Sequence, residues 1–220
     1  FEIEFITLTH SILEPNGLSI KTPVGTILHT GDWKCDPNPL IGEKVDVLKL
    51  KEIGNQNVLA MICDSTNVFN EGRAGSESDV RESMLNIIEK QKKKIVVTTF
   101  ASNVARMETI FYCAKKTNRQ ISLVGRSMHR IYKAARQCGY LQNLIEPIDP
   151  RDAKRIAREK IIYLSTGSQG EPMGATKRIV NGSHPDVYLE KGDTIIFSSK
   201  IIPGNEKKLY AMHNEIVRNG

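Results

Sequence analysis

Residues 94–220 alternate short apolar runs with longer stretches in which apolar residues recur every three or four positions. The short runs are rich in β-branched residues and predict strands. They read KIVVTTF (94–100), QISLVG (120–125), KIIYLSTG (160–167) and DTIIFSS (193–199). Because strands that alternate with helices favour a parallel sheet, the pattern predicts an α/β fold with helices on both faces of the sheet.

The longer stretches have the periodicity of amphipathic helices. Their expected buried stripes are Val104, Met107, Ile110 and Phe111; Met128, Ile131, Ala135 and Cys138; and Leu209, Met212, Ile216 and Val217. A further helix is predicted ahead of the first strand, with Ser76 or Ser78 as its N-cap. Its apolar stripe comprises Val80, Met84, Ile87 and Ile88.

The segment KIIYLSTGSQGEPMG (160–174) changes character after Leu164, where small polar residues and glycine replace the apolar run. Glu171-Pro172 suits the first turn of a helix, because proline loses no hydrogen bond there and a carboxylate meets the positive end of the helix dipole. Such a strand-to-helix turn presents backbone N–H groups and hydroxyls, which bind anions. It contains no lysine, so it is not a Walker loop.

All four predicted strands end in small polar residues. The ends read Thr98-Thr99-Phe100-Ala101-Ser102, Gly125-Arg126-Ser127, Thr166-Gly167-Ser168-Gln169 and Ser198-Ser199. In a parallel sheet these ends lie side by side, and ligands of such folds bind beyond them. The sequence therefore predicts an oxyanion or phosphate crevice, with a merely polar rim as the alternative.

Residues 1–75 follow a different pattern, in which each predicted strand ends near a histidine or an aspartate. FEIEFITLTH alternates and ends in His10, a hairpin through Thr22-Pro23-Val24-Gly25 leads to Asp32, and the run VLAMICDSTN, expected to be buried, reaches Asp64. An imidazole and two carboxylates suit a divalent metal such as zinc or manganese. The alternative is that Asp64 caps a turn and that His29 is a packing or surface residue.

Composition and charge narrow the class of protein. The chain has 220 residues, of which 40% are hydrophobic, and it contains no apolar run of membrane-spanning length and no signal-peptide pattern. The four cysteines, Cys35, Cys63, Cys113 and Cys138, form no Cys-x-x-Cys pair, so buried reduced thiols and a cytosolic location are expected. The first residue is Phe and not Met, which suggests a fragment.

The net charge of +6 is unevenly distributed. Residues 1–75 carry 6 basic and 10 acidic side chains, a net charge of −4, whereas the remaining residues carry 25 and 15, a net charge of +10. A basic half favours a polyanionic partner, although Lys92-Lys93-Lys94 and Lys207-Lys208 also fit solvated helix surfaces.

Seven segments occur in an order and at intervals that resemble ribonuclease J, of the β-CASP group in the metallo-β-lactamase superfamily. They are TLTHSI, HTGDWK, CDSTN, TFASNVAR, VGRSM, TGSQGEPM and IPGNE. The resemblance extends over essentially the whole chain. It implies part of a metallo-β-lactamase-like core in residues 1–74 and, in residues 75–220, a β-CASP domain with a mainly parallel, Rossmann-like sheet covered by helices.

The resemblance also implies roles for single residues. His10 and Asp32 match metal ligands, and Asp32 would bridge two metal ions and position an attacking hydroxide. Asp64 matches the first β-CASP motif, which orients a histidine that protonates the leaving oxygen. The strand-end loops match the face that grips RNA, which implies RNA or phosphate contacts for Ser102, Arg126, Ser127, Thr166, Gly167, Ser168 and Gln169.

Departures from the family pattern limit what this chain is expected to do. The His-x-His-x-Asp-His motif that supplies most metal ligands would precede Phe1, and the histidine that partners Asp64 and a last metal-binding histidine would follow Gly220. Ser199-Lys200 replaces the Ser-Pro of many members. We therefore expect an incomplete metal centre and an inactive fragment.

The function implied for the full-length protein is metal-dependent hydrolysis of RNA phosphodiester bonds, as a 5′ to 3′ exonuclease, an endonuclease or both. Zinc is the expected ion, with manganese or magnesium as alternatives. RNA is the expected partner in the cytoplasm, with no membrane association, and the full-length protein is expected to form a homo-oligomer. The alternative functions are a metal-free RNA or phosphate-binding module and a β-CASP nuclease acting in 3′-end processing or on DNA.

Overall fold

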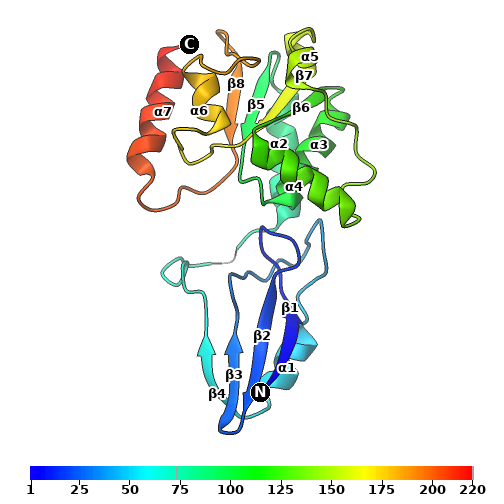
Figure 1. The fold of residues 1–220 in the computed structure, drawn as a ribbon, viewed down its shortest axis with the longest axis vertical. Helices are drawn as coiled ribbons and strands as arrows, with labels where there is room; N and C mark the ends of the chain where they lie inside the picture. Colours follow the sequence, from blue (N-terminus) through cyan, green and yellow to red (C-terminus); the bar gives the residue numbers. More distant parts are fainter. Residues whose placement is uncertain (73, 220) are drawn as a thin grey trace. The chain divides into compact units, whose positions relative to one another are not determined.

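The computed structural model describes residues 1–72 and 74–219, which form two compact units, Phe1–Val80 and Arg81–Gly220. Each unit contains its own four-stranded sheet (Figure 1). No helix among the described residues is both long and apolar enough to cross a membrane.

The sheet of the second unit is entirely parallel, as the sequence pattern predicts. Its strands are β5 (Ile95–Thr98), β6 (Gln120–Val124), β7 (Ile161–Ser165) and β8 (Thr194–Phe197), in the order β6-β7-β5-β8. Successive side chains of a strand point to opposite faces, and both Val96 and Val97 of β5 are 0% exposed. Both faces of the sheet are therefore covered at its centre.

Helices provide this cover (Figure 1). They are α2 (Glu77–Glu89), α3 (Val104–Lys116), α4 (Arg126–Gln137), α5 (Pro150–Ala153), α6 (Ala175–Val180) and α7 (Glu206–Arg218), with a 3₁₀ turn, η1 (Arg158–Lys160). Ala153 of α5 and Ile179 of α6 pack against Val96 and Tyr163 on one face. Helix α3 contacts β6 and β7, and α4 contacts β6.

The predicted helix stripes are mostly confirmed. The α3 stripe is buried throughout, whereas in α2 only Met84 and Ile88 are buried, Val80 is half-buried and Ile87 is 41% exposed. In α4 the prediction is wrong at Cys138, which is exposed because the helix ends at Gln137. Tyr132, which the predicted stripe leaves out, is buried and stacks on Phe111 with ring centroids 5.6 Å apart. In α7, Leu209 and Met212 are buried, whereas Val217 is 78% exposed.

The expectation of buried thiols is confirmed for one cysteine. Cys113 lies on the inner face of α3, and burial raises the pKa of its thiol to about 11. Cys35, Cys63 and Cys138 are exposed and free, because they lie in loops or just beyond the end of an element.

The prediction that Glu171-Pro172 opens a helix is wrong, because α6 begins only at Ala175. The Glu171 carboxylate instead accepts a hydrogen bond from the Gln169 amide (2.9 Å), which closes a local turn. The loop then folds back on itself, so that a Cβ on Gly174 would lie 2.8 Å from the Gly167 Cα atom, and Gly167 has a φ of +100°. Glycine is needed at both positions for this backbone contact.

A buried hydroxyl cluster holds both ends of this loop to the sheet. The Thr176 hydroxyl, 0% exposed, lies 2.8 Å from the Thr98 hydroxyl, 2.7 Å from the Ser165 hydroxyl and 2.8 Å from the Thr166 carbonyl oxygen. Thr98 ends β5 and Ser165 ends β7, so one side chain of α6 joins the carboxyl ends of two neighbouring strands.

The first unit has a mixed sheet in the order β1-β2-β3-β4. Strands β1 (Glu2–Thr7), β2 (Asn16–Thr22) and β3 (Gly25–His29) pair antiparallel, and β4 (Val58–Ile62) pairs parallel to β3. The predicted hairpin is confirmed, with Thr22 opposite Gly25. Helix α1 (Val47–Gly54), which the sequence analysis missed, is capped by the Asp46 carboxylate, which accepts a hydrogen bond from the Lys49 amide.

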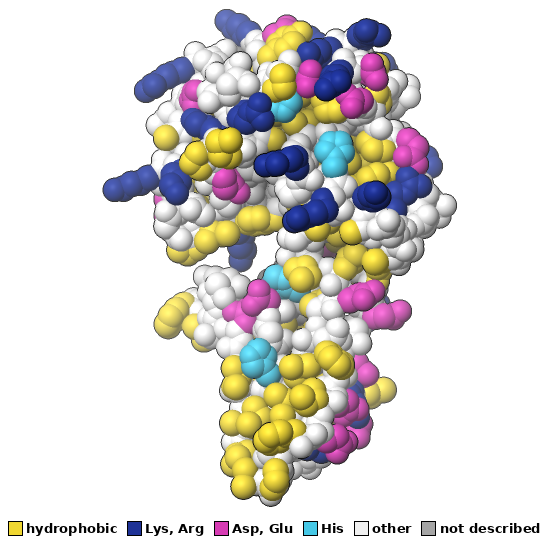
Figure 2. Space-filling model, viewed as in Figure 1, with side chains coloured by type: hydrophobic (Ala, Val, Ile, Leu, Met, Phe, Trp, Pro, Cys, Tyr) yellow, Lys and Arg dark blue, Asp and Glu magenta, His cyan; other side chains and the backbone are white. Residues whose placement is uncertain are grey.

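The prediction that the run leading to Asp64 is buried is wrong. In β4, Leu59, Met61 and Ile62 are each more than half exposed. Strand pairing places Ile62 on the same sheet face as Phe5, which is 72% exposed. Helix α1 lies on the opposite face, where Lys49 pairs with Glu4 at 2.7 Å. Among the described residues of this unit, the apolar side chains of the face that carries Phe5 and Ile62 remain exposed (Figure 2).

Asp36 organises the loop that follows β3. Its carboxylate is almost fully buried, accepts hydrogen bonds from the Asn38 and Glu77 amides, and lies 3.3 Å from the Lys34 ammonium group. Burial alone would raise the pKa of Asp36, but hydrogen bonds from Ser76, Glu77 and Asn38 and the charge of Lys34 lower it overall. The ionised carboxylate thus links this loop to the start of α2.

Thr176→Val removes the central hydroxyl of the cluster while keeping the shape of the side chain. We expect the free energy of unfolding of the second unit to fall by about 1–3 kcal/mol, because buried partners lose a hydrogen bond. Urea unfolding followed by the helical circular dichroism signal measures this change. Thr166→Val is the matched control, since the Thr166 hydroxyl makes no hydrogen bond within the described part of the chain. An equal loss in both variants would contradict the role of the cluster.

Asp36→Asn tests the buried carboxylate through its pH dependence. Because the pKa of Asp36 is lowered in the folded state, its ionised form stabilises the fold above the ordinary value of 3.8, and this contribution is lost as the pH falls below that value. We expect the variant to lose roughly 1.5–3 kcal/mol at neutral pH and progressively less in acid. Urea titrations of the fluorescence of Trp33, the single tryptophan, report on this unit. Exposed Asp32 provides the control variant Asp32→Asn, and a deficit that does not change with pH would exclude this mechanism.

Candidate functional site

A cavity of about 910 Å³ lies beyond the carboxyl ends of β6 and β7. Its wall includes the start of α4, the loop after β7, part of α6 and the loop that follows α6. Four residues predicted for phosphate binding line it together: Arg126, Ser127, Thr166 and Gly167. This is the edge of a parallel sheet at which ligands bind in α/β folds.

The start of α4 supplies donors to this cavity. Gly125 precedes the helix and provides no side-chain cap, and within the described residues the N–H groups of Arg126 and Ser127 have no acceptor. Unpaired N–H groups at the start of a 12-residue helix carry a partial positive charge. With the Ser127 hydroxyl and the Arg126 guanidinium they form a set of donors suited to an oxyanion.

The loop after β7 adds the backbone of Gly167, whose N–H group has no acceptor in the described ranges 1–72 and 74–219. Gly125 lets this loop come close to α4, because its φ is +111° and a Cβ there would lie 2.3 Å from the Thr166 hydroxyl oxygen. The two strand ends therefore meet at a point where a larger residue does not fit.

Ser168 and Gln169, also predicted for phosphate binding, are buried and do not line the cavity. The Gln169 side chain donates to the Lys200 carbonyl oxygen and accepts from the Ile202 amide, both at 2.8 Å, so it holds the loop after β8. The Ser168 hydroxyl is buried with no hydrogen-bond partner among the described residues.

Ser102 lies elsewhere on the same sheet edge. It is exposed in the loop after β5 and is not among the residues that line the cavity. The next residue, Asn103, caps α3 by accepting a hydrogen bond from the Arg106 amide. The buried Arg106 guanidinium donates to the Ser198 carbonyl oxygen at 3.0 Å, a structural contact that the sequence analysis missed. The sequence signals this contact only by placing an arginine in the first turn of the helix that follows β5.

The large cavity is rich in arginine. Arg126, Arg130, Arg151 and Arg178 line it, and within the described part of the chain none of the four is within ion-pair distance of a carboxylate. Basic side chains are numerous on the visible face of the second unit (Figure 2). Unpaired guanidinium groups that share one cavity favour a ligand with more than one negative charge.

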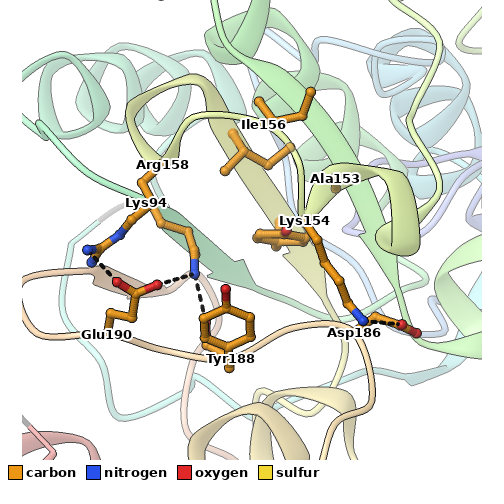
Figure 3. Close-up of a pocket in the computed structure, with 10 residues that line it drawn as sticks. Lys94, Ala153, Lys154, Ile156, Arg158, Asp186, Tyr188 and Glu190 are labelled. Atoms are coloured by element: carbon orange, nitrogen blue, oxygen red, sulfur yellow. Dashed lines mark hydrogen bonds and ion pairs between the residues drawn. The ribbon is translucent and has the colours of Figure 1, made fainter.

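A second, much smaller cavity shows the opposite arrangement (Figure 3). It has a volume of about 30 Å³, enough for one water molecule. Its cations face carboxylates: Arg158 lies 2.6 Å from Glu190, and Lys154 lies 2.9 Å from Asp186. Lys94 donates to the Tyr188 carbonyl oxygen and lies over the Tyr188 ring. The paired charges indicate a structural cavity.

In the first unit, the three predicted catalytic or metal-binding residues have different surroundings. The Asp64 carboxylate accepts hydrogen bonds from the hydroxyl and the amide of Thr66, which lower the pKa of Asp64, and the charge of His10 lowers it further. His10 lies beside the Ser11 hydroxyl, and Asp32 is exposed. The turn-capping alternative for Asp64 is therefore observed.

The side chains of the described residues include no group of three or more His, Cys, Asp or Glu that is arranged to hold a metal ion. His29 is half-buried, and its Nδ1 atom accepts a hydrogen bond from the Gly31 amide at 3.1 Å, so this nitrogen is engaged within the protein. An imidazole and a carboxylate are donor types that zinc takes, but two donors do not make a tight site. The described residues alone thus do not fit a complete metal centre.

Comparison with known proteins gives a consistent family. A ribonuclease J from Sinorhizobium meliloti is 39% identical over 220 residues, which are 100% of this chain and 39% of that protein. A ribonuclease J from Synechocystis is 40% identical over 93% of this chain and 32% of its own length. One from Thermus thermophilus is 34% identical over 100% of this chain and 38% of its own length. The chain thus spans about two-fifths or less of the length of these curated relatives.

The fold also resembles a solved structure. A protein of unknown function from Enterococcus faecalis matches 96% of this chain and 56% of its own, with a TM-score of 0.55 and 15% identity, which supports the fold alone. The family model described as ribonuclease J, beta-CASP domain, matches residues 92–216, the part that contains the whole parallel sheet and the large cavity. Because that match covers more than half of the chain, the chain belongs to the ribonuclease J family.

Proposed function

We propose that this chain is part of a metal-dependent hydrolase that cleaves RNA phosphodiester bonds, and that its second unit grips the RNA strand. The observation that supports this function best is the cavity beyond β6 and β7, in which helix N–H groups, a glycine amide and unpaired arginines come together. All are donors, and an RNA strand supplies the matching phosphate oxygens.

In this proposal the Arg126 guanidinium and the Ser127 hydroxyl bind one phosphate. The backbone N–H groups of Arg126, Ser127 and Gly167 donate further hydrogen bonds to the same phosphate. Ser102, in the neighbouring loop, contacts the strand outside the cavity. Ser168 and Gln169 have buried side chains, so in this proposal they hold the loop that carries the site and do not contact the RNA directly. A terminal phosphate carries more charge than a phosphodiester, so this subsite would prefer a 5′-phosphorylated end and favour 5′ to 3′ trimming.

We assign residues 1–74 to part of a metallo-β-lactamase-like core and residues 75–220 to the β-CASP domain. The family implies a metal-dependent enzyme, and we assign His10 and Asp32 to metal binding, with zinc as the ion that an imidazole and a carboxylate suit. The ion would supply an activated water and stabilise developing charge on the phosphate. Asp64, whose carboxylate accepts hydrogen bonds from Thr66, would position a proton donor.

Two other functions are consistent with parts of the chain. A metal-free RNA-binding module would use the same cavity, and a β-CASP nuclease for DNA or RNA 3′ ends would use the same fold. A preference for a 5′-phosphate distinguishes the proposed ribonuclease from a β-CASP nuclease that acts on 3′ ends or on DNA. We place the full-length enzyme in the cytoplasm as a homo-oligomer, in line with its sequence resemblance.

Metal content and activity test the assignment of the first unit. Because the described residues include no set of three metal ligands, we expect less than one tightly bound zinc per chain after dialysis and no metal-dependent RNA hydrolysis. Elemental analysis and gel assays with added zinc or manganese measure both. A stoichiometric ion, or turnover that Asp32→Ala abolishes, would show that the chain holds a complete centre.

Arg126→Ala tests the phosphate subsite. We expect the parent chain to bind a 5′-phosphorylated oligoribonucleotide more tightly than its 5′-hydroxyl counterpart, and the variant to lose this preference, at a cost of roughly 1.5–3 kcal/mol for a charged hydrogen bond. Fluorescence anisotropy with the matched RNAs at two salt concentrations measures the preference, which should weaken as salt rises. Arg155→Ala is the control, since Arg155 is exposed and does not line the cavity. Equal affinities of the parent for both RNAs would rule out the terminal-phosphate role.

A further inference from the structure

We propose that Arg151, Arg178 and His184 form a second phosphate-binding subsite in the large cavity, so that the cavity holds two phosphates of one RNA strand. This inference rests on the proposed RNA-binding function and extends it to residues that no motif singles out. The three residues come from α5, from α6 and from the loop after α6, whereas the first subsite comes from α4 and the loop after β7.

Some arginines of the second unit bind carbonyl oxygens or carboxylates of the protein, whereas others have no such partner in the described part of the chain. Arg119 donates to the carbonyl oxygens of Gln91 and Lys93, Arg136 pairs with Glu146, and Arg158 pairs with Glu190 and Asp193. Within the described residues, the guanidinium groups of Arg151 and Arg178 make no such contact, although both line a cavity. A guanidinium group carries five donors in a planar fork that matches phosphate oxygens, so the unused donors point to an anionic ligand.

The carboxylates of the same cavity are already engaged. Asp149 caps α5 by accepting from the Arg151 amide at 2.9 Å, and Asp186 pairs with Lys154 at 2.9 Å. Glu171 accepts from the Gln169 amide within its own loop. Asp149 and Glu171 keep their negative charge, and Lys154, together with the charge of Arg151, lowers the pKa of Asp186. Within the described residues, however, none of the three carboxylates is within ion-pair distance of Arg151 or Arg178, so both guanidinium groups keep their donors free for a ligand.

His184 adds a neutral donor with a fixed tautomer. Its Nδ1 atom accepts hydrogen bonds from the Asp186 and Val187 amides, at 3.2 and 3.1 Å. The ring proton must then reside on Nε2, which leaves one N–H donor on a side chain that lines the cavity. Burial, assisted by the charge of Arg178, lowers the pKa of His184, which agrees with the role of Nδ1 as an acceptor.

The backbone fixes this histidine beside the arginine. The Arg178 carbonyl oxygen accepts hydrogen bonds from the Ser183 and His184 amides, at 2.9 and 3.0 Å. The subsite is thus attached to the end of α6, whose Thr176 is held by the buried hydroxyl cluster. The cavity volume of about 910 Å³ lies near the upper end of ligand pockets, which suits a ligand longer than one phosphate group.

The test measures how the affinity for RNA depends on salt. The probe is a fluorescein-labelled decauridylate with a 5′-phosphate or a 5′-hydroxyl, and anisotropy gives its dissociation constant over a series of KCl concentrations. Each phosphate contact on a single strand adds about 0.7 to the slope of log K against log salt. We expect Arg178→Ala to lower the slope by about this amount and the affinity about tenfold, while the preference for the 5′-phosphate persists.

Arg178→Lys keeps the charge and should restore most of the slope, and Arg155→Ala, which removes an exposed arginine outside the cavity, should leave the slope unchanged. Thermal unfolding of Arg178→Ala should match that of the parent, because the Arg178 contacts named above are made by its backbone. If Arg178→Ala binds like the parent while Arg126→Ala loses the 5′-phosphate preference, the second subsite is wrong and the proposed function stands. If neither variant differs from the parent, both are wrong. If Arg155→Ala lowers the slope as much as Arg178→Ala, the effect is one of net charge and the second subsite is wrong.

Discussion

The buried hydroxyl of Thr176 is the interaction on which the site of this protein depends. It joins the ends of β5 and β7 to α6, in a region where no water competes for the hydrogen bonds. The loop between β7 and α6 is thereby held at both ends, and the contact between Gly167 and Gly174 closes it further. Its backbone amides reach the cavity in a fixed arrangement, so they can bind an anion without first being ordered.

The charges of the second unit follow a consistent division. Arginines and lysines that hold the fold together have carboxylate or carbonyl partners, as Arg158 and Lys94 do around the small cavity. The arginines of the large cavity do not have such partners among the described residues. An isolated ion pair on a protein surface contributes little stability, so the paired cations mainly hold neighbouring loops in position. The unpaired arginines can instead bind an anionic ligand.

The two units differ in how they bury their sheets. The second unit covers both faces of a parallel sheet, so its strands read as continuous apolar runs. The first unit covers the face that carries Glu4 and Ile6 with α1 and leaves Phe5 and Ile62 exposed on the other. Hydrophobic burial therefore stabilises the second unit more fully than the first, where the network around Asp36 adds polar links between loops.

The sequence by itself determined the strands, most of the helices, the parallel direction of the strands in the second unit and the family, because hydrophobic periodicity and local motifs are properties of neighbouring residues. It also identified the strand ends that meet at the large cavity, including Arg126 and Gly167. Only the tertiary structure decided that Gln169 is used internally, that α6 begins at Ala175, that β4 is exposed and that Arg178 and His184 join the cavity. These outcomes depend on contacts between residues far apart in the chain, and the hydrogen-bond partners and neighbours that fix them are visible only once the chain is folded.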